Sequence, residues 1–205
     1  MKLVVMTPST FFVEEDKILT TLFEEGLENL HISKTDTSSQ YMKRLLQLIP
    51  EKYHRHITLH HDFQLRDDYR LAGIHLSSLD AQPPQGYKGR IGRTCTNIMR
   101  LKAVRKTADY VFLGNLQGKE GKEGESRSHT SLTGEELWEA KRQGLLQRNV
   151  YAMGQLGLGD VAMVKELGFG GMVVGDDLWR KFDIQHAQDF RQLVRHFRNL
   201  LKASD

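Results

Sequence analysis

Cysteine is nearly absent from this sequence: among its 205 residues the only one is Cys95. A single cysteine excludes an internal disulfide, and with it the disulfide frameworks on which small secreted domains depend. A domain of this length buries roughly 70% of the surface of its unfolded chain, so a hydrophobic core is sufficient to hold it together. We therefore expect one domain, residues 1–205, in a reducing compartment, for which the cytoplasm is the natural choice.

Long apolar runs and a strong charge are missing as well. The N-terminal run MKLVVM is interrupted at Pro8, which makes it too short for a signal peptide. No stretch reaches the roughly 18 apolar residues that mark a transmembrane helix. The net charge is only +3, and the lysines and arginines are scattered along the chain. We expect neither a membrane nor a nucleic acid as a partner.

What the sequence does contain is a regular alternation of two patterns. Short, mostly apolar runs of the kind found in buried parallel strands are Lys2–Met6, Asn29–Ile32, Ile57–His60, Gly73–Leu76, Arg90–Gly92, Tyr110–Gly114, Val150–Met153 and Gly171–Val174. Amphipathic segments with helical spacing are Glu14–Gly26, Ser39–Tyr53, Asp62–Leu71, Ile98–Thr107, Thr133–Leu146, Asp160–Leu167 and Asp183–Ala203. The segment Leu79–Lys88 contains two prolines and is predicted to be a loop.

This strict strand–helix order predicts a parallel sheet, and eight units in one domain favour closure into a (β/α)8 TIM barrel. An open, doubly wound sheet is the alternative, although it usually needs only five or six strands. In a barrel, chemistry takes place at the carboxyl ends of the strands, where the following loops meet. Candidate functional residues are therefore those at or just after each predicted strand.

One connection is unusually polar. Residues 118–133 read GKEGKEGESRSHTSLT, with Leu132 as the single apolar residue. A connection of this length in a compact domain is usually either functional or disordered. Its glycines and its cations Lys119, Lys122 and Arg127 are typical of a mobile lid over an anionic substrate; a solvated insertion is the alternative.

Three segments carry a resemblance to a known family. ADYVFLGNLQGKEGK (Ala108–Lys122), LAGIHLSSLD (Leu71–Asp80) and VYAMGQLGLGDVAMVKELGFGGMVVG (Val150–Gly175) resemble, in order and separation, segments of thiamine phosphate synthases and their TenI-type thiazole tautomerase relatives. The resemblance covers nearly the whole chain. It implies a TIM barrel that joins hydroxymethylpyrimidine diphosphate to thiazole phosphate, both phosphate-bearing small molecules, and releases pyrophosphate. It also implies Mg²⁺, which prefers oxygen ligands, as a cofactor.

The resemblance assigns roles residue by residue. Asp80 falls on one magnesium ligand of the family, and Asp62 lies one position after the place of the other. Lys122 falls on the lid lysine that meets the pyrophosphate, and Thr94 replaces a serine that binds the diphosphate. Lys122 and Thr94 are therefore predicted to be catalytic.

The segment after the second strand departs from the family pattern. Where the family has Q-x-R-E-K, this chain reads HISKT, with His31 in place of the glutamine and Ser33 in place of the arginine. Lys34 lies one position before the family's lysine and would substitute for it if the loop shifts. We therefore expect His31 and Ser33 to bind substrate and Lys34 to take part in catalysis.

Further substrate contacts are expected from strand ends elsewhere in the barrel. Asn115 directly follows the sixth predicted strand, and Gly154 and Gly175 belong to the pair of strands that binds phosphate in the family. Asp176 and Asp177 stand where the family has small residues, and they would repel a phosphate unless they cap the following helix. The resemblance is also consistent with a homo-oligomer.

Histidines gather at the ends of three consecutive strands, at His31, His60, His61 and His75. Imidazole is a common metal ligand and general base, so this group could bind a transition metal or move a proton; packing and hydrogen bonding are the alternative. Alternation along the strand sends only one of the two adjacent histidines inward. We expect His60 and His75 to contact substrate. The other histidines are expected to be solvated: His54, His56, His129, His186 and His196.

Three functions stay open on the sequence alone. Asp80, Thr94 and Lys122 favour a thiamine-phosphate-synthase-type transferase. The altered HISKT segment favours a TenI-like relative without diphosphate chemistry, or a non-catalytic regulator that binds a thiamine intermediate.

Overall fold

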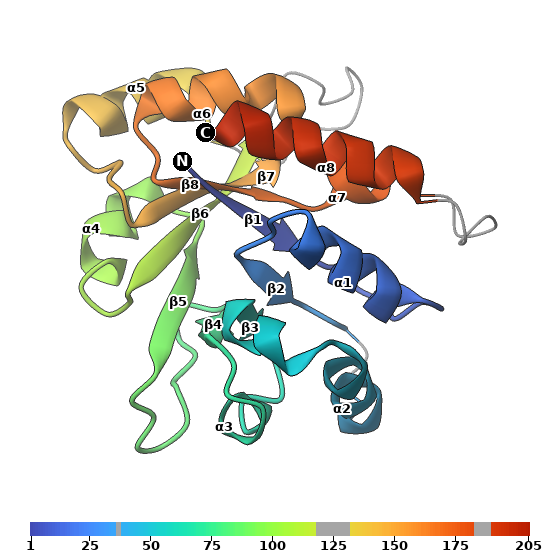
Figure 1. Cartoon of the computed structure of the whole chain (residues 1–205). Coiled ribbons are helices and arrows are strands. Elements are labelled where there is room, and N and C mark those ends of the chain that lie inside the picture. Colours follow the sequence, from blue (N-terminus) through green and yellow to red (C-terminus); the bar gives the residue numbers. More distant parts are fainter. Residues whose placement is uncertain (36–37, 118–131, 183–189) are drawn as a thin grey trace.

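Eight parallel strands close into a barrel in the computed structural model, which describes residues 1–35, 38–117, 132–182 and 190–205 (Figure 1). The strands are β1 (Lys2–Met6), β2 (Leu30–Ile32), β3 (Ile57–Leu59), β4 (Gly73–Leu76), β5 (Arg90–Cys95), β6 (Tyr110–Gln117), β7 (Val150–Gln155) and β8 (Gly171–Val174). Each strand pairs with the next, and β8 pairs with β1 over four residue pairs. This closure confirms the barrel and excludes the open sheet.

Helices surround the barrel in Figure 1. They are α1 (Glu15–Glu24), α2 (Ser39–Leu48), α3 (Leu65–Asp68), α4 (Leu101–Val104), α5 (Gly134–Arg142), α6 (Val161–Leu167), α7 (Asp176–Trp179) and α8 (Arg191–Ser204), with 3₁₀ turns η1 (Glu51–His56), η2 (Ile98–Arg100) and η3 (Leu158–Asp160). The helix expected over Ser39–Tyr53 ends at Leu48, because Pro50 drives Ile49 into an extended conformation. The helix expected over Ile98–Thr107 is a 3₁₀ turn followed by one short α-helix.

Strands β5, β6 and β7 run further than the sequence suggested. Thr94, Asn115 and Gly154 therefore lie inside strands and not in the loops after them. The pairing of β6 with β7 shifts register between Leu113 and Leu116, and Asn115 sits in this irregularity with a φ of 63°. The strand continues past the bulge because its pairing with β7 resumes at Leu116.

The connection from β4 to β5 has an unusual structure. Residues 77–89, all of which are described, contain no helix, as expected from the two prolines. In its place, the buried guanidinium of Arg93 donates to the carbonyl oxygens of Leu79 and Ala81, at 3.1 and 3.0 Å. One side chain of β5 therefore holds the loop that carries Asp80.

The core has two parts. A large cluster lies between the strands and the helices, where the apolar faces of α1, α2, α6 and α8 pack on the sheet. A smaller one fills the barrel interior with Val4, Tyr110, Phe112, Tyr151 and Val173. Inward-facing side chains of a barrel normally form such a packed core. In this protein, histidines complete it.

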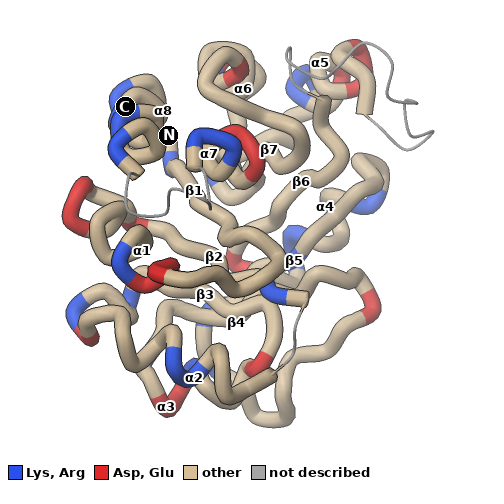
Figure 2. Tube along the Cα trace, turned by 90° about the vertical axis from the view of Figure 1, so that its right-hand side faces the viewer, with Lys and Arg blue, Asp and Glu red and all other residues tan. Residues whose placement is uncertain are grey.

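Charged residues of both signs are spread along the part of the chain that the structure describes. Basic and acidic positions are interspersed along the chain in Figure 2, consistent with the small net charge of +3. Within the described residues, no helix combines the length and apolar character needed to span a membrane. Most of the expected lid, residues 118–131 with Lys122, lies outside the described residues, as does the start of the helix expected from Asp183. Thr133, which follows this segment, caps α5 by accepting from the Glu136 amide.

Candidate active site

Three histidines meet inside the barrel. His31 comes from β2, His60 directly follows β3, and His75 comes from β4. His31 Nδ1 lies 2.9 Å from His60 Nε2, and the rings of His60 and His75 stack with their centroids 4.4 Å apart. Among the described residues, this is the group of three or more His, Cys, Asp or Glu side chains close enough to share a metal ion, with one ligand atom of each within 4.8 Å of the others. As expected, His60 points inward and its neighbour His61 is exposed.

Three hydroxyl groups extend this cluster. The phenol of Tyr110 lies 3.4 Å from both His31 Nε2 and His75 Nδ1. Thr94 Oγ1 lies 2.9 Å from His75 Nε2, and Ser77 Oγ lies 3.2 Å from His60 Nδ1. Every imidazole nitrogen of the cluster therefore has a hydrogen-bond partner, as buried polar groups require.

Burial keeps these histidines neutral. It lowers the pKa of His60 to about 3, and it lowers the pKa of His31 and of His75 well below the usual value, with the neighbouring histidines acting in the same direction. Burial also raises the pKa of Tyr110. The site is thus a set of uncharged donors and acceptors at neutral pH.

Gly92 makes room for this arrangement. A Cβ at this position of β5 would lie 2.2 Å from the Tyr110 ring and 2.5 Å from His75 Nδ1. Only a residue without a side chain lets the two groups meet.

We expect Gly92→Ala to separate the Tyr110 hydroxyl from His75 and to lower the free energy of unfolding by about 1–3 kcal/mol, because the added methyl overpacks the interior. Urea unfolding measures the change. Gly159→Ala is the matched control, since a Cβ there meets nothing within 4 Å. Equal stability of both variants would contradict the packing argument.

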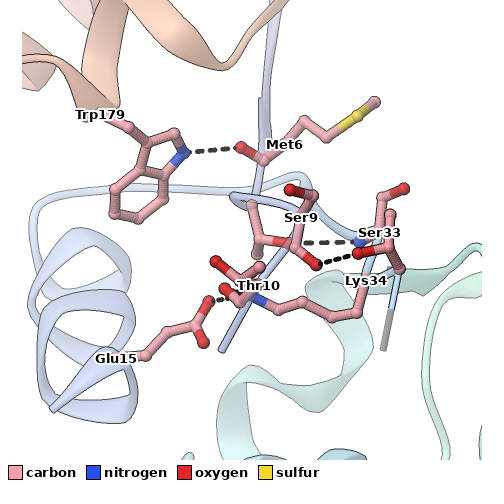
Figure 3. A network of polar contacts seen from close by, with 9 residues as sticks. Met6, Ser9, Thr10, Glu15, Ser33, Lys34 and Trp179 are labelled. Atoms are coloured by element: carbon pink, nitrogen blue, oxygen red, sulfur yellow. Dashed lines mark hydrogen bonds and ion pairs between the residues drawn. The ribbon is translucent and has the colours of Figure 1, made fainter. Parts of the chain in front are cut away.

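Lys34 is engaged in a buried ion pair (Figure 3). Its ammonium group lies 2.5 Å from Glu15 Oε1, donates to the Thr10 carbonyl at 3.0 Å and sits 4.8 Å from the centre of the Phe11 ring. The side chains of Lys34 and Glu15 are 1% and 3% exposed. The structure thus places this predicted catalytic lysine against α1, where it holds the β1–α1 loop. Ser33 lies beside it, and its backbone N–H donates to Thr7 Oγ1.

The two predicted magnesium ligands, Asp62 and Asp80, differ in their burial and in their hydrogen bonds. Asp62 is half-buried with a φ of 52°, and its Oδ1 accepts a hydrogen bond of 2.5 Å from Ser39. Asp80 is exposed, and its backbone N–H donates to Ser78 Oγ. Their carboxylates are the hard oxygen ligands that magnesium prefers, whereas the histidine cluster is not such a set.

The ends of β7 and β8 bring Gly154 and Gly175 to the same rim of the barrel. Here two backbone amides already have carboxylate partners. Gly157 donates to Asp160, and Leu158 donates to Asp177 Oδ2, which also lies 2.6 Å from His196 Nε2. The carboxylate of Asp177 therefore points toward the loop after β7. A phosphate bound at this loop would be repelled by it, so the side chain does not have the outward orientation that phosphate binding requires.

Several functional residues escaped the sequence analysis, and two expectations about histidines were wrong. Tyr110 and Glu15 carried no local signal of their contacts, whereas Ser77 and Arg93 lie just after predicted strands, among the candidate positions, but received no role of their own. His54, expected to be solvated, is buried and bonded to the carbonyl oxygens of Leu46, Ile49 and Tyr69, because η1 turns it inward. His196, also expected to be solvated, is largely buried against Asp177. His129 and His186 lie outside the described residues.

Comparison with known proteins finds a solved structure with high sequence identity to this chain. The crystal structure of thiamine phosphate pyrophosphorylase from Bacteroides thetaiotaomicron is 41% identical, with 100% of this chain and 98% of that chain covered and a TM-score of 0.88. A thiamine phosphate pyrophosphorylase from Pyrococcus furiosus is 17% identical over 99% of this chain and 95% of that chain, with a TM-score of 0.72. A tryptophan synthase α-subunit from Pyrococcus furiosus is 16% identical over 98% and 97%, with a TM-score of 0.62.

The two distant likenesses show the barrel fold alone. No protein-family model matches the chain, and no curated protein matches it either. The identity of 41% extends over the full length of the chain and includes the strands that build the site. The chain therefore belongs to the thiamine phosphate pyrophosphorylase (thiamine phosphate synthase) family.

Proposed function

We propose that this protein is a thiamine phosphate synthase, which condenses hydroxymethylpyrimidine diphosphate with thiazole phosphate and releases pyrophosphate. The observation that carries the proposal is the 41% identity, over the whole chain, with a protein described as thiamine phosphate pyrophosphorylase. In this reaction the diphosphate leaves, and the thiazole nitrogen attacks the pyrimidine cation. Positioning and charge stabilisation are then the main tasks of the protein.

The proposed roles follow the geometry of the rim. Asp80 and Asp62 would hold magnesium, which neutralises the charge of the diphosphate. Thr94, at the end of the interior cluster, offers a hydroxyl to the substrate, and Lys122 would meet the departing pyrophosphate. Arg93 fixes the loop that carries Asp80 and acts as a positioning residue.

One observation favours a second candidate function. The ion pair of Lys34 with Glu15 uses the one cation that the segment after β2 offers within the described residues. A diphosphate that depends on that segment would lack a charge partner. A non-catalytic relative that binds thiazole phosphate, or another thiamine intermediate, fits this feature.

The test is a coupled assay with hydroxymethylpyrimidine diphosphate, thiazole phosphate and magnesium, in which thiamine phosphate and pyrophosphate are measured. We expect turnover that falls at least about 100-fold in Lys122→Ala and in Asp80→Ala, since each removes charge stabilisation from the departing diphosphate. Asp68→Ala, which removes an exposed carboxylate of α3, is the matched control. Absence of turnover in the wild type, with thiazole phosphate still bound, would reject the synthase and support the binding protein.

A further inference from the structure

The polar groups of the barrel interior form one continuous series of hydrogen bonds, and buried Thr58 of β3 makes a side contact with the Tyr110 hydroxyl at its centre. In order along the series they are Ser77, His60, His31, Tyr110, His75 and Thr94. Each histidine uses both of its ring nitrogens, one toward either neighbour. Four of the six groups are at least nine-tenths buried, so water cannot readily replace a missing partner.

The direction of these hydrogen bonds is coupled from end to end. A neutral imidazole has one N–H donor and one acceptor nitrogen, and a hydroxyl donates one proton and accepts others. The low pKa values of the buried histidines agree with one proton on each ring. Thr58 donates to the Tyr110 oxygen, a contact that acts against the rise of the Tyr110 pKa, so the phenol proton is left for one of the two histidines. If Thr94 donates to His75 Nε2, then His75 must donate from Nδ1 to Tyr110, Tyr110 donates to His31, and each following group is fixed in turn.

The atoms in contact give this coupling a simple signature. In one direction, from Thr94 to Ser77, all three histidines carry their proton on Nδ1. In the other direction, from Ser77 to Thr94, all three carry it on Nε2. A mixed pattern places two donors or two acceptors face to face across the 2.9 Å between His31 and His60, or it leaves the Tyr110 proton or one of the ring nitrogens beside Tyr110 without a partner. Such a contact costs the desolvation of a buried group without a hydrogen bond.

We propose that these six groups form a two-state proton relay, in which the three histidines always carry their proton on the same ring nitrogen. The relay is a property of the barrel interior and holds whether or not the chain makes thiamine phosphate. It explains why this interior contains histidine and tyrosine where apolar side chains would fill a barrel.

The state of the relay also determines which of its two terminal hydroxyl groups, Ser77 or Thr94, can donate a hydrogen bond to a ligand and which can accept one. Ser77 directly follows β4, and Thr94 lies on the neighbouring strand β5; the two are adjacent because Leu76 pairs with Arg93 and each hydroxyl residue comes next. When Thr94 donates into the relay, its oxygen accepts from a ligand and the Ser77 proton is free to donate; in the other state the two exchange roles. The pair therefore fits a neutral group with one donor beside one acceptor, such as an amide or an aminopyrimidine ring.

Reversal of the relay moves protons without changing charge. A ligand that spans both ends gives one proton to Thr94, each group passes its own proton to the next, and Ser77 returns one proton to a second atom of the ligand. The ligand changes its tautomer, and no further reactant takes part. A metal ion held by the same three histidines is the competing use of this cluster, because one ring nitrogen of each lies within 4.8 Å of the others.

The first experiment measures the histidine tautomers by long-range ¹H–¹⁵N correlation NMR of the ¹⁵N-histidine-labelled full chain, purified with a chelator. We expect His31, His60 and His75 to show the same tautomer, or the same fraction of each tautomer if the relay reverses quickly. A different tautomer on any of the three overturns the proposal. Zinc that binds stoichiometrically and abolishes the tautomer signals of all three also overturns it in favour of a metal site.

A variant then separates the relay from mere packing. Tyr110→Phe removes the hydroxyl at the centre, so we expect His31 and His60 to stay matched while the tautomer fractions of His75 depart from theirs. Tyr151→Phe is the matched control, because this buried tyrosine stacks on Tyr110 at 5.5 Å and takes no part in the series. Unchanged matching of His75 in Tyr110→Phe contradicts the relay. Buried His54, bonded to backbone carbonyl groups, is the internal reference for a folded chain.

Discussion

The free energy of unfolding is expected to fall steeply as the pH is lowered from 6.5 to 4. A histidine has a pKa of about 6.5 in the unfolded chain, whereas burial lowers the pKa of His60 to about 3 in the folded protein. The stability that His60 contributes is therefore complete above pH 6.5 and is lost as the pH falls toward 3. Over 2.5 pH units this amounts to about 3 kcal/mol for His60 alone, and His31 and His75 act in the same direction.

One buried acid opposes this trend. Burial raises the pKa of Glu15 to about 6, above its ordinary value of 4.5. Its contribution is largest at low pH and is lost as the pH rises through 6, a change of about 2 kcal/mol. Three histidines outweigh one glutamate, so acid destabilises the protein.

Urea unfolding at pH 6.5, 5.5 and 4.5 measures the slope of stability with pH. Because His31→Gln removes one group that takes up a proton on unfolding, we expect its slope to be lower by up to about 1.4 kcal/mol per pH unit. His61→Gln, at the exposed neighbour of His60, is the control for loss of a histidine outside the cluster. A slope that stays unchanged in His31→Gln would show that this histidine is already charged in the folded protein.

Loss of Lys34 alone is expected to destabilise the fold by about 3–5 kcal/mol, because Lys34→Met leaves the carboxylate of Glu15 buried without its partner. Loss of both charges in Lys34→Met/Glu15→Leu is expected to restore stability to that of the wild type or above it. The reason is that burial raises the Glu15 pKa to about 6 even beside the lysine, so desolvation exceeds attraction in this pair.

A double-mutant cycle in urea at pH 7 measures these changes, and thiamine phosphate formation in the folded double variant separates the two roles of Lys34. If the lysine only holds the β1–α1 loop, the double variant keeps its turnover. If turnover disappears from a stable double variant, Lys34 acts on the substrate as its sequence position predicts. Equal stability of the single and double variants would contradict a buried, coupled pair.

The fold could be predicted because its signals are local. Each strand is a short apolar run, and the strict alternation with amphipathic segments permits few architectures. Alternation along the strand also predicted that only one of His60 and His61 points inward. These properties depend on neighbouring residues in the sequence, so they are visible without the structure.

The site was less visible because its contacts join distant residues. The hydroxyl of Tyr110 meets His31 across 79 positions, and ADYV alone presents an ordinary strand start. Lys34 was predicted to be catalytic because it lies one position before the family's lysine, but the sequence does not show that Glu15 faces it. The contact of Ser77 with His60 depends on the pairing of β3 with β4, which is a feature of the folded barrel.

The loop between β4 and β5 has a consequence for local opening. Where other units of the barrel cover their strands with a helix, this one relies on the guanidinium of Arg93 and the carbonyl oxygens of Leu79 and Ala81. Further anchors of residues 77–89 are Leu79, which packs against the core, and Tyr87, whose hydroxyl donates to the Arg90 carbonyl. Because no helix covers this segment, its amides should exchange with solvent before those of β4 and β5. Both Asp80 and Ser77 belong to this segment, so local opening here would change their positions while the barrel stays closed.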